Sequence, residues 1–388
     1  MPNFVFPNDI HPPWSIMIVI YPYLTGLVAG AFVVSALYHV FHVKALAPVS
    51  RLALVAATCF CACAGLPLQL HLHHPEHSYL IFVTPSTSSA MVMFGLIYNA
   101  YLLLLFVEMW LVFRPTIVER ANTAKGPLRL VYRALCLGSF EITPKARELD
   151  EKLITILSFV GIPAACLLHG YVGFLFGAIK ANPWWSTALM PVIFLASAVV
   201  SGIAAQILLY QFLCWRRKIT PEVDCVRTMV KYLWGFLFFA FALEVLEVVH
   251  MAYEGSEDWP ILAQLLSKQL KVSYVWIQVI IGSLVPFVLL PIAMLERFSA
   301  KTTFKVAGFA AALVLLQVLA MRWNVVVGGQ MYSKSFRGFV EYPIHVAGRE
   351  GLITGAVVLC LPLVLMWGAI RVLRLPLQLQ PKVEADAE

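Results

Sequence analysis

The chain has 388 residues, of which 61% are hydrophobic and 13% are charged. A soluble domain carries roughly twice that charged fraction, so the composition excludes a soluble globular protein and indicates a polytopic integral membrane protein. The net charge of +7 comes mostly from basic residues between the apolar stretches, so it indicates contact with membrane lipid and is no sign of nucleic-acid binding. No nucleic-acid partner is expected.

Apolar stretches long enough to cross a bilayer recur along the chain, since a span needs about 20 mostly apolar residues. Such a bundle is all-α, and we expect it to occupy residues 1–374. The polar tail, residues 375–388, is expected to be cytoplasmic and disordered. Nine spans are predicted: Trp14–Val43, Leu52–Leu70, Ser88–Phe113, Leu153–Ile179, Thr187–Trp215, Val230–Ala252, Tyr274–Leu295, Phe304–Met321 and Leu352–Leu373.

Basic residues are distributed unequally between the two sides of this predicted bundle. If the N-terminus is outside, the cytoplasmic segments hold 21 of the 28 Lys and Arg residues and the other side holds 7. Cytoplasmic loops carry an excess of Lys and Arg. We therefore expect the N-terminus outside and the C-terminus inside, in the cytoplasmic (inner) membrane of a bacterium or archaeon.

Two long connecting segments are expected to have structure of their own. The inner segment Arg114–Lys152 contains PLRLVYRAL, a basic amphipathic pattern that predicts a helix at the membrane surface. The outer segment Arg322–Gly351 carries aromatic residues, glycines and mixed charges, and is predicted to form an ordered cap or a partner-binding surface. Ser86 or Thr87 is expected to cap the third span.

Three polar residues stand inside the sixth span. Glu244, Glu247 and His250 have the spacing i, i+3, i+6, which places them on roughly one face of a helix. Such groups are costly inside a bilayer and by default mark a functional site. We interpret them as a buried proton-transfer group, and a hydrogen-bonded contact between helices is the alternative interpretation.

Further polar side chains are predicted at a similar depth, in the outer third of the bundle. His169, for example, lies roughly 25 Å from the inner end of its span at ~1.5 Å per residue. The inner half offers fewer such groups. The outer set consists of Tyr21, His71, Ser88, Ser89, His169 and Arg322, and the inner set of Glu108, Gln206, Tyr210 and Gln211.

This arrangement suits quinone chemistry. A quinone is flat and apolar, and its two carbonyl oxygens take up two protons with two electrons. Its site needs an apolar slot, hydrogen-bond donors at the head group and a protonatable path to one aqueous side. His, Tyr and Glu side chains near the outer surface provide these groups.

Three alternatives use some of the same residues. A b-haem could take His169 and His250 as axial ligands. A proton-coupled transporter would carry an internal repeat and spans interrupted at the midplane, whereas here the polar groups crowd one side. The HLHH run, residues 71–74, is similar to a zinc or copper ligand cluster, but no second ligand group stands at a fixed spacing. We expect no haem and no metal.

Several stretches resemble the NrfD/PsrC family, the membrane subunits of quinone-reactive, molybdoenzyme-type iron–sulfur complexes. HPPWSIMIVIYPYLTGLVAGAFV (His11–Val33) resembles the opening span of that family, and HLHHPEHSYLIFVTPSTSSAMVMFG (His71–Gly95) its acid-Leu-Gly-Arg-Pro and Pro-x-x-Ser segment. The stretch Leu167–Gly202 and RWNVVVGGQ (Arg322–Gln330) look like a longer branch that includes the Qrc and Dsr membrane subunits of sulfate reducers.

The resemblance implies partner subunits. The expected partners are a ferredoxin-like 4Fe–4S subunit on the extracytoplasmic face and a further catalytic or cytochrome c subunit. The sequence departs from the pattern at His71, where the family often has an acid, and at Tyr21, where a shorter member has a quinone-contacting His.

Together these observations predict the membrane anchor and quinone-binding subunit of a respiratory oxidoreductase complex. It would exchange electrons between the quinone pool, with menaquinone expected, and the iron–sulfur subunit, with or without proton translocation. It would have no independent enzymatic activity. The predicted head-group residues are Tyr21, His71 and His169, with Ser88, Ser89 and Arg322 around them, and the predicted proton-transfer residues are Glu244, Glu247 and His250.

Overall fold

The computed structural model describes residues 12–86, 88–332 and 338–375, and these residues are helical apart from loops and one isolated bridge between Tyr332 and Phe339. The predicted tail lies outside the described residues except for Leu375. The helices are α1 Ile16–His39, η1 Lys44–Leu46, α2 Ala47–Ala64, α3 Leu66–His71, η2 Pro75–His77, α4 Leu80–Val83, α5 Ala90–Thr123, α6 Pro127–Leu135, α7 Pro144–Gly177, α8 Met190–Arg217, α9 Val223–Glu254, α10 Trp259–Gln264, η3 Leu265–Gln269, η4 Lys271–Leu284, α11 Val285–Met294, α12 Ala300–Val326, η5 Gly328–Gln330 and α13 Leu352–Leu373.

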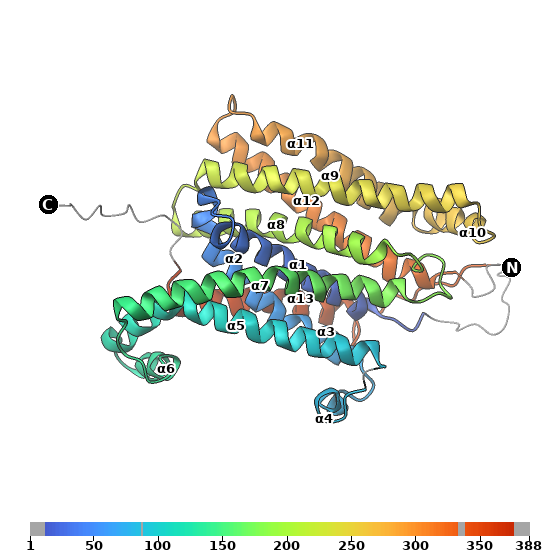
Figure 1. Ribbon diagram of the computed structural model, residues 1–388. Coiled ribbons are helices and arrows are strands. Elements are labelled where there is room, and N and C mark those ends of the chain that lie inside the picture. Colours follow the sequence, from blue (N-terminus) through green and yellow to red (C-terminus); the bar gives the residue numbers. More distant parts are fainter. Residues whose placement is uncertain (1–11, 87, 333–337, 376–388) are drawn as a thin grey trace.

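The prediction of nine spans in an all-α fold is confirmed. Within the described residues nine helical segments are long and apolar enough to cross a membrane, and each overlaps one predicted span. They run side by side as an elongated bundle (Figure 1). The chain is therefore a multi-pass integral membrane protein.

Several helices continue beyond the predicted ends of their spans. The third span extends to Thr123 and the fourth begins at Pro144, so much of the predicted loop Arg114–Lys152 is helical. A partly buried ion pair between Arg114 and Asp150, with 2.7 Å between Nη1 and Oδ1, joins these two extensions. The amphipathic stretch PLRLVYRAL forms the predicted helix, α6, and its position at the membrane surface stays a prediction.

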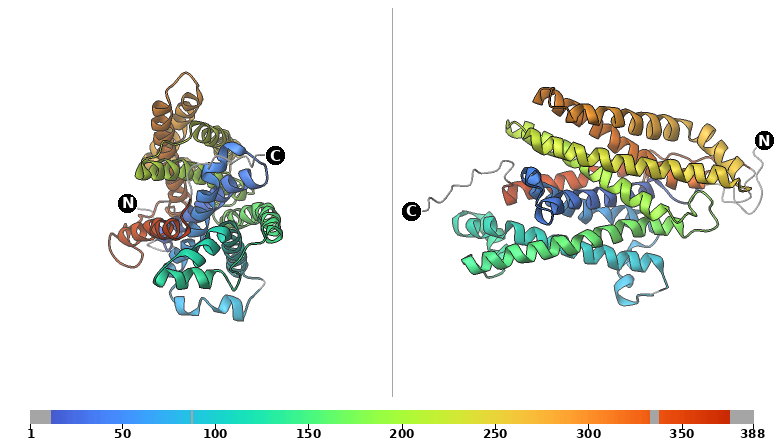
Figure 2. Two further views of the ribbon diagram at one scale, coloured as in Figure 1. Left: turned by 90° about the vertical axis from the view of Figure 1, so that its left-hand side faces the viewer. Right: turned by 45° about the horizontal axis from the view of Figure 1, so that its top comes forward.

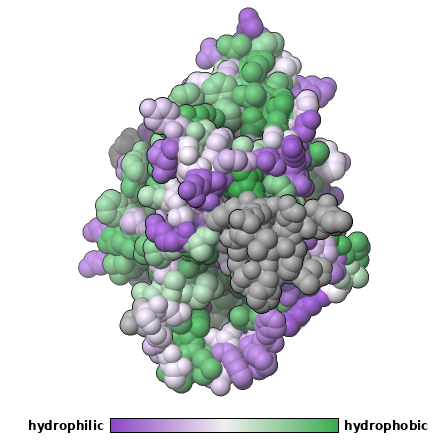
Figure 3. Space-filling view, turned by 90° about the vertical axis from the view of Figure 1, so that its right-hand side faces the viewer, coloured by the Kyte–Doolittle hydropathy of each residue, from purple (hydrophilic) through white to green (hydrophobic). Residues whose placement is uncertain are grey.

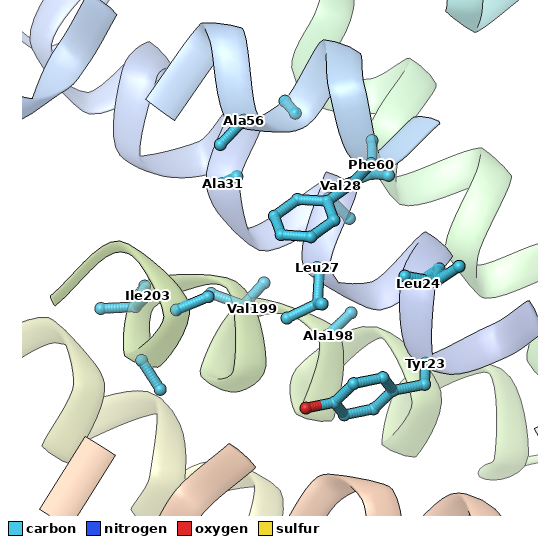
Figure 4. Packing of buried hydrophobic residues seen from close by; sticks show 14 of the residues in the cluster. Tyr23, Leu24, Leu27, Val28, Ala31, Ala56, Phe60, Ala198, Val199 and Ile203 are labelled. Atoms are coloured by element: carbon cyan, nitrogen blue, oxygen red, sulfur yellow. The ribbon is translucent and has the colours of Figure 1, made fainter. Parts of the chain in front are cut away.

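Helix α1 lies at the centre of the bundle and packs against α2, α7, α8 and α12. Its apolar stretch is 89% buried, whereas that of α5 is 17% buried, so α5 presents most of its apolar side chains to the outside of the bundle. Figure 4 shows α1 side chains such as Leu27 and Val28 enclosed between Phe60 of α2 and Val199 of α8. Helix α1 is thus surrounded by apolar side chains on nearly every side.

The crossing of α1 and α8 depends on two glycines. A Cβ atom on Gly202 would lie 2.3 Å from backbone atoms of Gly30, and a Cβ on Gly30 would lie 2.4 Å from the Ala198 carbonyl oxygen. Small residues let membrane helices approach closely where the hydrophobic effect supplies no drive between them. This contact fixes α8, and the buried polar residues it carries, directly against α1.

Helices α9, α11 and α12, with η4, form one side of the bundle, and α5 and α7 lie on the opposite side (Figures 1 and 2). Helix α8 contacts α7, α9 and α12 and so joins the two sides. Segment η4 is π-helical over 14 residues. In a helix with i→i+5 hydrogen bonds, residues five apart lie on nearly one face, and such segments are frequent at functional sites.

The two ends of the bundle differ. The end that carries the N-terminus holds α3, α4, α10 and the loops 178–189 and 338–351, and the other end holds α6 and the turns 40–46, 218–222 and 295–299 (Figure 1). Figure 3 looks onto the N-terminal end, where hydrophilic and hydrophobic residues are interspersed. The predicted outer cap begins after α12, since Arg322 lies inside that helix and not in the loop.

Candidate functional site

The side chain of Arg322 is fully buried near the N-terminal end of the bundle. Its Nη2 donates hydrogen bonds to Ser197 Oγ at 2.7 Å and to the Phe194 carbonyl at 3.3 Å. The guanidinium also lies 3.9 Å from the centroid of the Phe194 ring. None of its described hydrogen-bond partners is a carboxylate, so the positive charge is held by dipoles and an aromatic face.

His169 of α7 is fully buried beside this guanidinium. Its Nε2 lies 3.1 Å from Nη2 of Arg322. Because a guanidinium has donors and no acceptor, Nε2 must accept, and the ring hydrogen of the neutral imidazole is then on Nδ1. Among the described residues Nδ1 has no hydrogen-bond partner. His169 therefore offers a buried donor to a molecule that reaches this ring.

Tyr21 of α1 provides a second buried donor. Its side chain is 3% exposed, its ring packs edge-on against Phe94 at 5.3 Å, and its hydroxyl has no partner among the described residues. The hydroxyl is near enough to interact electrostatically with the Arg322 guanidinium. His169 also borders α1, because its Cε1 lies 3.4 Å from the position that a Cβ on Gly26 would take. The structure thus places His169 in contact with Arg322, and it places Tyr21 within electrostatic range of the guanidinium, on the helix that His169 borders. The role of these residues at a quinone head group stays a prediction.

Glu244 of α9 ends a chain of amide side chains. Gln278 Nε2 donates to Glu244 Oε2 at 2.9 Å and Gln317 Nε2 to Oε1 at 3.3 Å. Asn324 Nδ2 donates to Gln278 Oε1 at 2.8 Å, and Ser273 Oγ donates to Asn324 Oδ1 at 2.6 Å. The π-helical η4 presents Ser273 and Gln278, which are five residues apart, to the same partner, Asn324. We refer to these five residues as the amide chain.

Glu247, one turn further along α9, has a different environment. It is 8% exposed, and its Oε2 has no hydrogen-bond partner among the described residues. Both Glu244 and Glu247 line a cavity of about 40 Å³ between α8, α9, η4 and α12. A cavity of that size holds water, but it is far below the roughly 300–1,000 Å³ of ligand pockets.

The expected burial of His250 is wrong. Its side chain is 70% exposed and lies 4.0 Å from Glu254 on the outer surface of α9. A helix turns about 100° per residue, so a spacing of i, i+3, i+6 moves the third side chain about 120° away from the first. Glu244 and Glu247 face the bundle, and His250 faces away from it.

His71 lies at the end of the bundle, nearer the surface than Tyr21. Its Nδ1 is 2.9 Å from Glu350 Oε2 and 3.4 Å from Ser15 Oγ, and Ser15 is six residues, or about 9 Å, before Tyr21 in α1. Burial raises the pKa of the Glu350 carboxyl, but its hydrogen bonds with Ser15 and His71 outweigh burial and hold that pKa below its ordinary value. Together His71 and Glu350 tie α3 to the loop before α13.

The two serines have different positions. Ser89 caps α5, where its Oγ accepts from the Val92 backbone N–H at 3.4 Å, so the cap lies beyond the predicted Ser86 or Thr87. Thr87 is outside the described residues. Ser88 is exposed and hydrogen-bonds Ser86 at 2.9 Å. No contact brings either Ser88 or Ser89 to the His169–Arg322 pair within the described part of the chain.

The histidines considered for haem or metal are separated by the fold. His169 is buried against Arg322 and His250 is exposed, so the two imidazoles do not face one space as axial ligands would. Of the outer run, His74, Glu76 and His77 place one ligand atom each within 4.8 Å of one another. All three are exposed, and the His74 ring already hydrogen-bonds Glu76 at 2.9 Å.

The neutral amides and Ser197 were not singled out from the sequence. Gln278 and Gln317 were detectable in the sequence, since each is an uncharged polar residue within a predicted apolar span. Asn324 lies three residues beyond the predicted end of its span. Which of these amides hydrogen-bond to each other could not be predicted from their spacing in the sequence, because the hydrogen bonds join three helices.

In the other half of the bundle, Ser158 Oγ donates to the buried Glu108 Oε1 at 2.6 Å. A cavity of about 890 Å³ opens one turn away, at Leu111 and Val112.

These features define a polytopic membrane protein with a buried arginine–histidine centre and a buried chain of carboxyl and amide groups near one end. The protein belongs to the NrfD family: the family described as polysulphide reductase, NrfD, matches residues 6–333. The resemblance to the NrfD/PsrC family seen in the sequence is therefore confirmed.

Named relatives include a subunit of the selenate reductase of Mesobacillus selenatarsenatis, which is 30% identical over 81% of this chain and 73% of its own length. The protein NrfD of Escherichia coli is 25% identical over 82% of this chain and 95% of its own. The Hdr-like menaquinol oxidoreductase integral membrane subunit of Archaeoglobus fulgidus is 23% identical over 84% of this chain and 72% of its own.

Proposed function

We propose that this protein is the quinone-binding membrane subunit of a respiratory oxidoreductase complex in the cytoplasmic membrane of a bacterium or archaeon. The observation that carries the proposal is the pair of buried donors, Tyr21 Oη and His169 Nδ1, that have no described protein partner beside a buried guanidinium. The names of the relatives support it, since they include subunits of a selenate reductase and of a menaquinol oxidoreductase.

The residues present fit a quinone head group. A carbonyl oxygen needs a donor, and buried donors left without a partner cost free energy, about 1–3 kcal/mol each. Tyr21 and His169 would each donate to such an oxygen, and the edge of Phe94 supplies an apolar wall beside Tyr21. The charge of Arg322 would stabilise electron density that develops on the head group. A quinone supplies the two-electron, two-proton chemistry, with menaquinone expected.

Protons would move through the carboxyl groups of α9. The cavity at Glu244 and Glu247 has room for water, and Oε2 of Glu247 has no hydrogen-bond partner among the described residues. Glu247 is therefore the residue proposed to exchange protons with water. Glu244, whose two oxygens accept from Gln278 and Gln317, is the inner member of the pair. His250 lies on the exposed surface of α9 and would exchange protons with the aqueous side.

Electrons would pass to or from a partner on the same side as the head group. The Tyr21–His169–Arg322 centre and the α9 carboxyl groups all lie toward the N-terminal end of the bundle. If that end is extracytoplasmic, as the distribution of Lys and Arg predicts, a ferredoxin-like 4Fe–4S subunit would dock there, with a catalytic or cytochrome c subunit beyond it. His71, Ser88 and Ser89 would border the approach. The proposal uses no haem and no metal in this subunit.

The proposed donor role of Tyr21 is tested by comparing two neighbouring tyrosines. Tyr21→Phe removes a hydroxyl that has no described protein partner, so the thermal stability of the protein should not fall. Loss of one hydrogen bond to quinone should raise the KM for a soluble menaquinol analogue roughly tenfold in the assembled complex.

Tyr23→Phe is the matched control. It lies on the same helix, and its hydroxyl donates to the Leu315 carbonyl at 3.4 Å. It should leave the KM unchanged. Equal kinetic constants for the two variants would refute a donor role for Tyr21.

A further inference from the structure

A groove of about 860 Å³ lies between α8 and α13 at the end of the bundle opposite the N-terminus. It is distinct from the proposed quinone site. Its walls combine apolar side chains with four arginines, and no carboxylate lines its described part. The lining residues are Leu208, Leu209, Phe212, Leu213, Arg216, Arg217, Leu363, Met366, Trp367, Ile370, Arg371, Arg374 and Leu375.

The apolar and charged parts of the groove are separated along the helix axes. On α8 the lining runs from Leu208 to the arginines at Arg217, and on α13 from Leu363 to Arg374 at its C-cap. At ~1.5 Å per residue these stretches are about 14 and 16 Å long. One leaflet of a hydrocarbon core is about 15 Å thick, half of the full core. The groove as a whole, arginines included, is therefore about as long as one leaflet is thick, and the arginines lie at its end, where head groups would be.

The arginines are available to a ligand. Arg371 stacks on the exposed Trp367 ring, 3.8 Å from its centroid, and Arg217 donates to the Leu375 carbonyl. Arg216 and Arg374 have no hydrogen bond or ion pair with the described residues. Each guanidinium keeps unused N–H groups, and an arginine fork matches the paired oxygens of a phosphate.

We propose that this groove binds an anionic phospholipid. Its phosphodiester would lie among Arg216, Arg217, Arg371 and Arg374, and its acyl chains along Phe212, Leu363 and Met366. A zwitterionic lipid has the same chains, but its cationic head group would meet four guanidiniums. The inference rests on the membrane-spanning fold and is independent of the proposed quinone chemistry.

The test measures lipid binding to the full-length protein, purified in detergent and freed of lipid. Native mass spectrometry would follow titration with phosphatidylglycerol or phosphatidylcholine of matched acyl chains. Phosphatidylglycerol should bind more tightly to the wild type. Arg216→Gln/Arg371→Gln should weaken its binding roughly 20- to 30-fold, the effect of two basic residues at a membrane surface.

Lys301→Gln/Lys305→Gln is the control. It removes two exposed charges at the same end of the bundle, on α12 and outside the groove, and should change binding by less than about twofold. Equal affinity for the two lipids, or equal losses in both double variants, would overturn the proposal. Displacement of the lipid by soluble glycerophosphate at comparable concentration would overturn it too, because the site would then bind the anion alone.

Discussion

Glu244 and Glu247 lie one turn apart on α9, yet their environments predict different responses to the same substitution. Glu247 has an oxygen without a described partner and borders the water-sized cavity. Glu247→Gln keeps the shape and removes the exchangeable proton. We expect quinol turnover of the complex to fall at least about 100-fold, the usual contribution of general acid–base catalysis, with assembly unaffected.

The other glutamate should respond through stability. Both oxygens of Glu244 accept from amide donors, and the Gln278 amide is fixed because its Oε1 accepts from Asn324. Glu244→Gln places a donor against a donor and should destabilise the protein by about 1–3 kcal/mol, measured as reduced recovery and a lower Tm. Glu254→Gln, an exposed acid of the same helix, is the control for both. Full turnover in Glu247→Gln would exclude Glu247 from proton transfer.

At the residue scale, the sequence located the buried groups better than it located their partners. Tyr21, His169 and Arg322 were each expected in the outer third, and depth alone was enough to group them. Which atoms meet depends on the rotation of each helix, and a hydropathy pattern specifies that rotation only loosely in spans that are apolar on nearly all sides. His250 shows the limit, since a drift of about 120° over six residues carried it to the surface.

The crossing of α1 and α8 makes a prediction at the scale of the helix. A Cβ on Gly202 would meet Gly30 backbone atoms at 2.3 Å, and a backbone cannot move aside as a flexible side chain can. We expect Gly202→Ala to lower the free energy of unfolding by about 1–3 kcal/mol, as overpacking does. A thermal-shift measurement on the purified protein would detect the loss.

Gly235→Ala on α9 provides the comparison. Nothing lies within 4 Å of the Cβ it would add, and alanine favours a helix by about 0.5–1 kcal/mol over glycine. It should leave stability unchanged or raise it. If both substitutions shift the Tm equally, the close approach of α1 and α8 does not determine stability.

The membrane spans were predictable because each is a long apolar run, but hydropathy marks where lipid ends and not where the helix ends. Helices α5 and α7 continue beyond the apolar runs that marked their spans, and Arg114 and Asp150 pair between these extensions. The π-helical turn of η4 was not predictable either. Its residues are as apolar as those of an α-helical span, and the register that brings Ser273 and Gln278 to Asn324 is set by packing against α12.

At the scale of the whole molecule, the position of the partner can be tested with lysine-reactive cross-linkers. Lys180 and Lys268 are exposed at the N-terminal end of the bundle, and Lys125 and Lys145 are exposed at the other end. Electron transfer requires the iron–sulfur cluster near the quinone head group. In the purified complex, cross-links from the iron–sulfur subunit should therefore fall on Lys180 and Lys268. Links mainly to Lys125 and Lys145 would place the partner at the wrong end for this mechanism.

The buried arginine also bears on how the protein is made. An arginine in a span that leaves the translocon alone costs up to about 2.5–3.5 kcal/mol of insertion free energy at the membrane centre, and α12 carries Gln317 and Asn324 besides Arg322. The Arg322 side chain hydrogen-bonds His169 of α7 and Phe194 and Ser197 of α8. Both helices are synthesised before α12. We therefore expect the eighth span to enter the bilayer beside α7 and α8, so that the order in which the chain emerges from the ribosome favours its insertion.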